Sequence, residues 1–252
     1  MTAPAVGHTI QAACHREMPP LVYATAKFHI AGDCGLLVEY GSSIALEVNQ
    51  KVRSMTLALK GNALEGVREV IPSYCSILVV YDPVKTNPHT LKKALTAVER
   101  QLPEIEIPPP RVFEIPVCYG DDYGPDIGVV ARTNHLSPEQ VVHIHASVEY
   151  LIHMVGFTPG FPFLGGLPEV LHTPRLATPR ASVPRGSVGI ANDQTGIYPV
   201  SSPGGWQLIG RTPLRLFIPE REPPIRYRAG DRIRFKPISA SAYEKFRQEA
   251  DT

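Results

Sequence analysis

Proline is the residue that most restricts what this chain can fold into. The 252 residues include 26 prolines, about twice the share of roughly 5% that is usual in proteins. Six of them precede Leu102, and 20 follow from Pro103 onward. Because proline interrupts helix interiors and central strands, the second half cannot be a long helical bundle. The run Pro108-Pro109-Pro110 favours a short, stiff, extended linker, so we expect a domain boundary there.

The residues before this linker predict a ferredoxin-like domain over residues 25–107. Their patterns follow the order β-α-β-β-α-β, which is typical of that fold. Strands are expected at residues 27–30 and 34–40 (an opening pair), at 67–72 and 74–81, and near 112–117. Apolar side chains recur every three or four positions from Ile44 to Leu59, which predicts a helix from about Ser43. A second helix is expected to begin after Asn87, a favourable N-cap that is followed by proline.

The residues after the linker predict a small closed β-barrel over residues 111–240. Short strand patterns punctuated by glycine and proline are typical of such barrels. Ser137, Pro138 and Gln140 form a capping-box pattern that predicts one helix within them. Residues 241–252 are expected to form a short C-terminal helix and tail, and residues 1–24 a flexible leader. The whole chain is therefore predicted to be an α+β protein of two domains.

Composition and charge exclude several classes of function. Lys and Arg together number 25 and Asp and Glu 24, so a nucleic-acid or anionic-membrane surface is not expected. There is no run of 18 apolar residues, and the N-terminus has no signal-peptide pattern, so we expect a cytoplasmic protein. The four cysteines are scattered without a C-x-x-C pair, and no histidine cluster shares a helix face. No metal site is therefore predicted.

The segment 156–213 is the best candidate for a functional surface. It holds 10 glycines and 9 prolines but only six charged residues, which is unusual for a solvated linker. One interpretation is a set of barrel corners that need glycine. The other is a rigid binding surface, in which proline lowers the cost of ordering the loops. Its apolar part would include four aromatic residues: Phe157, Phe161, Phe163 and Trp206.

Long ordered motifs in this segment and elsewhere resemble one known family. They are GDCGLLVEYG (32–41), IPSYCSILVVYDP (71–83), GFTPGFPFLGGLP (156–168), TPRLATPRASVPRGSVGIA (173–191), QTGIYPVSSPGGWQLIGRTPLRLF (194–217) and GDRIRFKPI (230–238). Over roughly residues 25–240 the chain resembles the allophanate hydrolase subunit 1 family, also called the KipI or PxpB family. One departure is Asn192-Asp193, which stands before Gln194 where glycine or alanine-glycine is expected.

The resemblance implies a fold, partners and a reaction. It implies a ferredoxin-like domain followed by a cyclophilin-like β-barrel. It also implies a subunit 2 partner of the PxpC or KipA type and a third subunit, PxpA, which together form an ATP-dependent 5-oxoprolinase. This chain would then be a non-autonomous subunit of a heteromeric hydrolase that converts 5-oxoproline to glutamate. Because it lacks G-x-x-x-x-G-K-[ST], its ATP, with or without Mg²⁺, would be shared with a partner.

Two alternatives fit the same resemblance. The first is a KipI-like inhibitor of a histidine kinase, which would dock through the barrel. The second is an amide-binding module of the urea carboxylase type, which would need a biotin carboxylase and a biotin carrier that this chain does not contain. Fold analogy alone also suggests a peptidyl-prolyl isomerase, which is the weakest option.

The candidate site residues come partly from the residue types and partly from the resemblance. The resemblance makes His145 a candidate acid or base, and Arg211 is the preferred cation beside it. Substrate contacts are expected from arginines that bind carboxylates or phosphates, from neutral hydrogen-bonding groups, and from a Gly-Gly-Trp turn whose glycines permit positive φ. These residues are Arg175, Arg180, Gln194, Thr195, Tyr198, Gly204, Gly205 and Trp206. The pocket wall or partner surface is expected to consist of Phe157, Pro159, Phe161 and Phe163.

Overall fold

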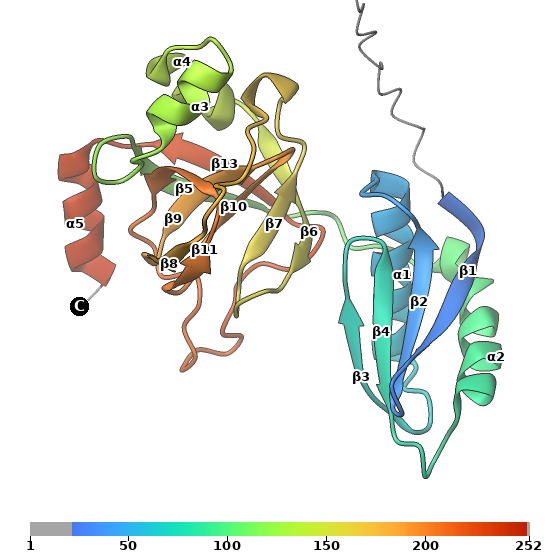
Figure 1. Cartoon of the computed structure of the whole chain (residues 1–252). Helices are drawn as coiled ribbons and strands as arrows, with labels where there is room; N and C mark the ends of the chain where they lie inside the picture. Colours follow the sequence, from blue (N-terminus) through green and yellow to red (C-terminus); the bar gives the residue numbers. More distant parts are fainter. Residues whose placement is uncertain (1–21, 251–252) are drawn as a thin grey trace, which may run out of the picture.

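The computed structural model describes residues 22–250, which fold into two domains joined by an extended segment (Figure 1). Residues 1–21 of the predicted leader lie outside the described residues. The first strand begins at Val22, so the last three residues of that leader belong to the first domain. Of the residues described, no helix is long and apolar enough to cross a membrane.

The first domain is a four-stranded antiparallel sheet with two helices. The strands are β1(Val22–Ala31), β2(Gly35–Gly41), β3(Val67–Pro72) and β4(Ser76–Tyr81), and the helices are α1(Leu46–Gly61), α2(Pro88–Glu99) and the 3₁₀ turn η1(Leu102–Glu104). Both predicted helices are confirmed. The Asn87 side chain accepts a hydrogen bond from the backbone N–H of Thr90, and Pro88 occupies the first helical position, where no donor is lost.

The core of this domain lies between the sheet and the two helices. Buried residues alternate along β2 and β4, because successive side chains of a strand point to opposite faces. They pack against the apolar faces of α1 and α2, on which Val52, Met55 and Leu95 are almost completely buried. Both helices therefore cover one face of the sheet.

The edge strand of the first sheet belongs to the predicted opening pair. The sheet order is β1-β2-β4-β3, so the N-terminal strand β1 occupies the edge beside β2. The strand predicted near residues 112–117 was expected there as the last strand of the ferredoxin-like pattern. The predicted domain boundary at residue 107, however, leaves this strand outside the first domain. The structure has it in the barrel: the strand, β5(Val112–Tyr119), pairs with β12(Gln207–Arg211) and β13(Arg232–Pro237) in the second domain. The first domain is thus a ferredoxin-like sheet whose edge strand precedes it in sequence.

The second domain is a closed seven-stranded barrel. Its strands follow the order β10-β7-β6-β13-β5-β12-β9, and only β5 and β13 pair in parallel among them. Their bounds are β6(Glu149–Val155), β7(Pro162–Gly165), β9(Ser187–Ala191), β10(Gln194–Ile197), β12(Gln207–Arg211) and β13(Arg232–Pro237), and a separate pair consists of β8(Arg180–Val183) and β11(Ser202–Gly204). The predicted α+β fold, with a cyclophilin-like barrel, is confirmed.

Helices lie outside the barrel strands. They are α3(Ile127–Thr133), α4(Pro138–Ala146), the 3₁₀ turn η2(Glu169–Leu171) and α5(Ala240–Ala250). The predicted capping box of α4 is confirmed: the Ser137 hydroxyl accepts from Gln140 N, and the Gln140 side chain accepts from Ser137 N. Helix α3 was not predicted, because its seven residues are too few to show a periodic pattern.

The two domains make direct contact beside the linker. The buried side chain of Asn49 on α1 donates hydrogen bonds to the carbonyl oxygens of Tyr74, 3.1 Å away, and of His153, 3.0 Å away. Tyr74 in turn donates its hydroxyl to Gln194 at 3.1 Å and packs edge-on against Phe163. One buried amide therefore ties the first domain to barrel strand β6, and one tyrosine ties it to β7 and β10.

Candidate functional site

The segments singled out in the sequence enclose one cavity of about 370 Å³ on the barrel. We call it the aromatic pocket. Its lining residues come from the loop before β7, the loop before β8, and the turn around β11. They are Phe157, Phe161, Phe163, Arg175, Leu176, Pro179, Tyr198, Pro203, Gly204, Gly205 and Trp206. Its volume lies within the range of about 300–1,000 Å³ that is typical of small-molecule sites.

The base of the aromatic pocket is a cluster of edge-to-face rings. Phe161 lies 5.1 Å from Tyr198 and 5.4 Å from Trp206, measured between ring centroids, with the ring planes nearly perpendicular. This arrangement places the positive edge of one ring on the negative face of another. Phe161, Tyr198 and Trp206 are all at most 6% exposed. The rings therefore belong to a packed minor core, which holds the pocket in a fixed shape.

The two glycines of the pocket were expected to permit positive φ and a close approach of the backbone to a ligand or partner. Neither Gly204 nor Gly205 has a positive φ, so the expected left-handed turn is absent from this segment. A Cβ on Gly204 would overlap the hydroxyl group of Tyr198, whereas a Cβ on Gly205 would make ordinary contact with Pro179 at 3.5 Å. Close approach to Tyr198, rather than backbone conformation, therefore requires glycine at position 204.

Arg175 is the predicted arginine that lines the pocket. It is exposed and, within residues 22–250, forms no ion pair. Burial raises the pKa of Tyr198, and a hydrogen bond to the Trp206 backbone and the charges of Arg175 and Arg180 oppose that rise. The charge of Arg175 thus acts on Tyr198, inside the pocket. It is the group best placed there to bind an anion.

Arg180 and Arg211 do not provide the free cations that were expected. Arg180 forms a 2.7 Å ion pair with Asp126, whose other oxygen accepts from Leu208 N at 2.7 Å. It therefore joins β8 to β12 and the start of α3. Arg211 does not line the pocket; its charge acts on Tyr243 of α5, and its Nε is buried without a partner among the described residues. Arg211, which was expected to be the main cation of the site, therefore lies outside the aromatic pocket.

The structure does not support His145 as an acid or base. Its ring is 0% exposed, stacks on Phe235 at 4.5 Å, and forms hydrogen bonds at both nitrogens. Nδ1 lies 2.8 Å from the Tyr119 hydroxyl, and Nε2 lies 2.9 Å from Thr195 Oγ1. Because the Thr195 proton is donated to Gly189 O, Nε2 must carry the ring proton. Burial lowers the pKa of His145 to about 3, so the ring is neutral.

Thr195 and Gln194 are likewise not part of the aromatic pocket. Thr195 is fully buried and supports His145, as described above. Gln194 is 7% exposed, and its side-chain oxygen accepts a hydrogen bond from the Tyr74 hydroxyl across the domain boundary. Successive strand residues point to opposite faces, so neighbours on β10 could not both have reached one ligand. Of the three residues expected to bind an amide, only Tyr198 therefore lines the pocket.

The predicted wall residues are divided between the base and the rim of the pocket. Phe161 and Phe163 form the base, whereas Phe157 is 66% exposed at the rim and has a φ of +67°. A bulky residue with positive φ is uncommon, and an exposed one suggests a functional reason for the strain. Pro159 is exposed but does not line the cavity.

Three lining residues were not predicted: Leu176, Pro179 and Pro203. All three belong to the motifs that carry the family resemblance, so their positions in TPRLATPR and SSPGGW were available as a signal. They supply packing surface rather than reactive groups, so their residue types alone do not mark them as part of a site. No group of three or more His, Cys, Asp or Glu residues within 22–250 is arranged to hold a metal ion.

Comparisons with known proteins assign this chain to a class. The family model described as "Carboxyltransferase domain, subdomain C and D" matches residues 26–227. The 5-oxoprolinase B subunit of Bacillus subtilis (strain 168) is 43% identical over 232 residues, covering 87% of this chain and 96% of that protein. The protein of the same name from Escherichia coli O157:H7 is 45% identical over 217 residues, covering 84% and 96%.

Solved structures agree with this result. The conserved uncharacterised protein PH0987 of Pyrococcus horikoshii is 41% identical, with a TM-score of 0.52, covering 86% of this chain and 100% of that one. TTHA0988 is 35% identical with a TM-score of 0.71, covering 82% of this chain, which spans 40% of its length. The Kluyveromyces lactis urea carboxylase, at 23% identity and a TM-score of 0.75, shows the shared fold over 93% of this chain and 24% of that enzyme.

The chain therefore has the fold and the sequence of a carboxyltransferase domain, subdomain C and D. Within that class, the chain belongs to the family of the 5-oxoprolinase B subunits, as the motifs predicted.

Proposed function

We propose that this chain is the B-type subunit of an ATP-dependent 5-oxoprolinase that opens the lactam ring of 5-oxoproline to give glutamate. It would act with a subunit 2 partner of the PxpC or KipA type and with PxpA. The family membership supports a role as a subunit. The observation that carries the proposal is the aromatic pocket, whose rigid rings surround a cavity bordered by Arg175, which has no ion pair among the described residues.

The chemistry of the pocket suits a small ring that carries one carboxylate. The aromatic base can pack against the apolar edge of a lactam ring and exclude water from it. Arg175 can bind the carboxylate through two parallel hydrogen bonds, the geometry in which guanidinium binds carboxylate most strongly. Phe157 stands at the rim, where an exposed aromatic side chain can cover a bound ligand or meet a partner. In this proposal the chain positions the substrate, which lowers the barrier by fixing the orientation of the reacting bond.

The pocket does not fit the triphosphate of ATP. Among the described residues that line it, Arg175 supplies the only positive charge, whereas a triphosphate is usually met by several cations or by a metal ion. The missing P-loop motif points the same way. We therefore propose that the partner subunit holds the nucleotide, with the aromatic pocket open toward it.

Reconstitution tests this proposal. The purified chain alone is expected to show no 5-oxoproline-dependent ATP hydrolysis. The chain combined with its subunit 2 partner and PxpA is expected to release glutamate and phosphate together, and only when 5-oxoproline is present. Turnover by the single chain would contradict the shared-site proposal. A complete complex that assembles without turnover would contradict the substrate assignment and favour the kinase-inhibitor or urea carboxylase alternative.

A further inference from the structure

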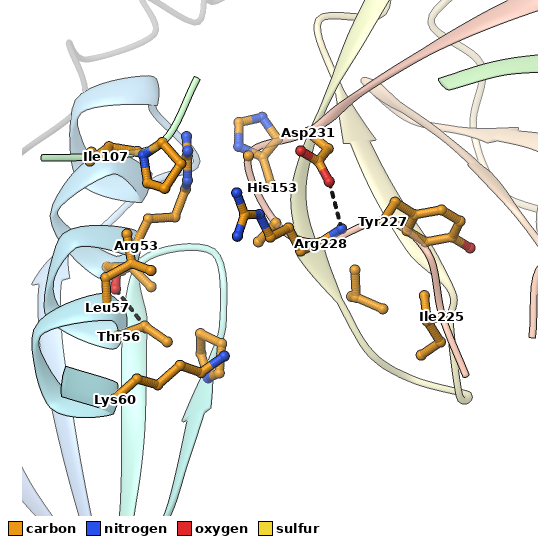
Figure 2. A pocket seen from close by; sticks show the side chains of 16 residues that line it. Arg53, Thr56, Leu57, Lys60, Ile107, His153, Ile225, Tyr227, Arg228 and Asp231 are labelled. Atoms are coloured by element: carbon orange, nitrogen blue, oxygen red, sulfur yellow. Dashed lines mark hydrogen bonds between the residues drawn. The ribbon is translucent and has the colours of Figure 1, made fainter. Parts of the chain in front are cut away.

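A second cavity, of about 270 Å³, lies between the two domains (Figure 2). We call it the seam cavity. Helix α1 of the first domain supplies one wall, with Arg53, Thr56 and Lys60. The segment before β13 supplies the facing wall, with Tyr227, Arg228 and Asp231. It shares no lining residue with the aromatic pocket, so it is a separate site.

Three cations line the seam cavity without an ionic partner. Within residues 22–250, Arg53, Lys60 and Arg228 form no ion pair. Their positive charges come from both walls, so docking of the domains brings like charges together. Such an arrangement is unfavourable unless an opposite charge lies between them.

The carboxylate in the cavity is already engaged. Asp231 is 1% exposed and binds Arg111 at 2.7 Å, and it also accepts from the backbone N–H groups of Arg111 and Arg228. Burial alone would raise the pKa of Asp231, but these hydrogen bonds and the charge of Arg111 hold it below the ordinary value. Asp231 is therefore ionised. It pairs with Arg111 and also attracts Arg53, so this one carboxylate faces the positive charges of several cations.

Arg53 is a half-buried cation of the seam cavity. Its guanidinium packs on Gly230, where a Cβ would overlap it, and Gly230 has a φ of +93°. The pKa of Arg53 is lowered by burial; Asp231 opposes this change and Arg228 adds to it. A glycine in a left-handed conformation thus makes room for a half-buried guanidinium that has no carboxylate partner among the described residues. The backbone is shaped to place a charge in the cavity.

A buried histidine on the barrel side of the cavity adds an independent observation. His153 on β6 lines the cavity, is 7% exposed, and has an Nδ1 atom without a hydrogen-bond partner among the described residues. Buried polar atoms are nearly always paired, so an orphan atom indicates a missing ligand or water. Its carbonyl oxygen is held by Asn49, which fixes this part of β6 against α1.

We propose that the seam cavity binds a small oxyanion, a phosphate or a carboxylate, between Arg53 and Arg228. The bound group neutralises the facing cations, and Lys60 adds a third charge at the mouth. A cavity of about 270 Å³ lies just below the usual range of small-molecule sites, which favours a small anion over a whole nucleotide. Because both domains contribute, binding also stabilises their docked arrangement, by the same linkage that couples any ligand to the state it prefers.

Calorimetric titration of the full chain tests the proposal, with inorganic phosphate in one arm and 5-oxoproline in the other, at constant ionic strength. At least one anion is expected to bind, and Arg53→Gln and Arg228→Gln are each expected to weaken it tenfold or more. Arg226→Gln is the matched control: it removes the same charge from the same loop but lies outside the cavity. It is expected to bind as the wild type does.

Thermal melts keep the test independent of folding defects. Without an anion, Arg228→Gln is expected to melt at or above the wild-type temperature, because it relieves repulsion; with phosphate or 5-oxoproline, it is expected to lose the stabilisation. Absence of binding by both anions overturns the proposal, as does binding that neither seam variant weakens. Binding of 5-oxoproline that Arg175→Gln abolishes and both seam variants retain belongs to the aromatic pocket. The seam proposal is then overturned unless phosphate binds and both seam variants weaken the binding of phosphate.

Discussion

The aromatic pocket and the seam cavity are built in opposite ways. The first is formed by the barrel alone, from buried rings that pack on one another, with one cation at its border. The second is formed by two domains and is lined by three cations that have no ion pair among the described residues. The first is therefore present whenever the barrel is folded. The second exists only while the domains are docked.

This difference separates shape from charge as a means of recognition. Rigid aromatic walls select a ligand by its outline, because edge-to-face rings cannot adjust without loss of packing. Facing cations attract an anion whatever its outline, but they also repel each other when it is absent. Substitutions of the buried rings of the aromatic pocket should thus lower the stability of the barrel. Substitutions in the seam cavity should instead change how tightly the two domains dock.

Replacement of Trp206 should have the largest effect. Trp206→Ala removes a ring that is 6% exposed and packs on Phe161, so we expect the free energy of unfolding to fall by about 3–5 kcal/mol. Phe157→Ala, at the exposed rim of the same pocket, should change it by less than about 1 kcal/mol. Urea denaturation measures both. Equal losses would show that the rings do not form the core of the pocket.

Acid should destabilise the barrel through His145. Its pKa in the folded state is about 3, whereas an unfolded histidine titrates near 6.5, so the unfolded chain binds the extra proton between these values. The stabilisation is complete above pH 6.5 and is lost as the pH falls, by about 1.4 kcal/mol per pH unit. His145→Gln cannot take up this proton. Its stability, measured by denaturation from pH 7 to pH 4, should therefore fall less steeply than that of the wild type; parallel curves would rule out a buried neutral ring.

The adjacent glycines of the pocket offer a matched pair. Gly204→Ala forces a methyl group against the Tyr198 hydroxyl and should destabilise the barrel by about 1–3 kcal/mol, the usual range for overpacking. Gly205→Ala meets only ordinary contact with Pro179 and should change stability by less than about 0.5 kcal/mol. Thermal melts compare the two. The reverse order would mean that backbone conformation, not the approach to Tyr198, requires the glycines.

The contact between the two domains can be weakened without loss of barrel stability. Asn49→Ala leaves the carbonyl oxygens of Tyr74 and His153 without their shared donor, which should cost about 1–2 kcal/mol of domain docking. We expect faster proteolysis in the linker around residues 105–110, with the barrel fragment remaining intact. Unchanged cleavage kinetics would show that this amide does not hold the domains together.

Much of the fold could be predicted because local signals agree with it. The caps at Asn87 and Ser137 and the apolar spacing of α1 favour helices through interactions within a few residues of sequence. The sheet that β5 joins could not be predicted in this way. Its place in the sequence order suits the ferredoxin-like pattern, and only its long-range pairing with β12 and β13 places it in the barrel.

The site was predicted by segment better than by residue. The Gly- and Pro-rich motifs do enclose a pocket, because their turns and rings pack on one another. Individual polar residues were misplaced because sequence does not show what a side chain meets. Arg180 was expected to be free but has Asp126 as its partner, and His145 was expected to be accessible but lies within the barrel.

The kinetic effect of Arg175→Gln tests most directly whether the aromatic pocket binds the substrate. In the reconstituted complex, kcat/KM for 5-oxoproline should fall about 10- to 100-fold, the equivalent of one charged hydrogen bond of about 1.5–3 kcal/mol. The melting temperature should be unchanged, because Arg175 is exposed and has no ion pair among the described residues. Arg185→Gln, an exposed arginine outside the pocket, is the control and should retain full activity. Full activity of Arg175→Gln, or equal losses in both variants, would contradict the assignment of the substrate to this pocket.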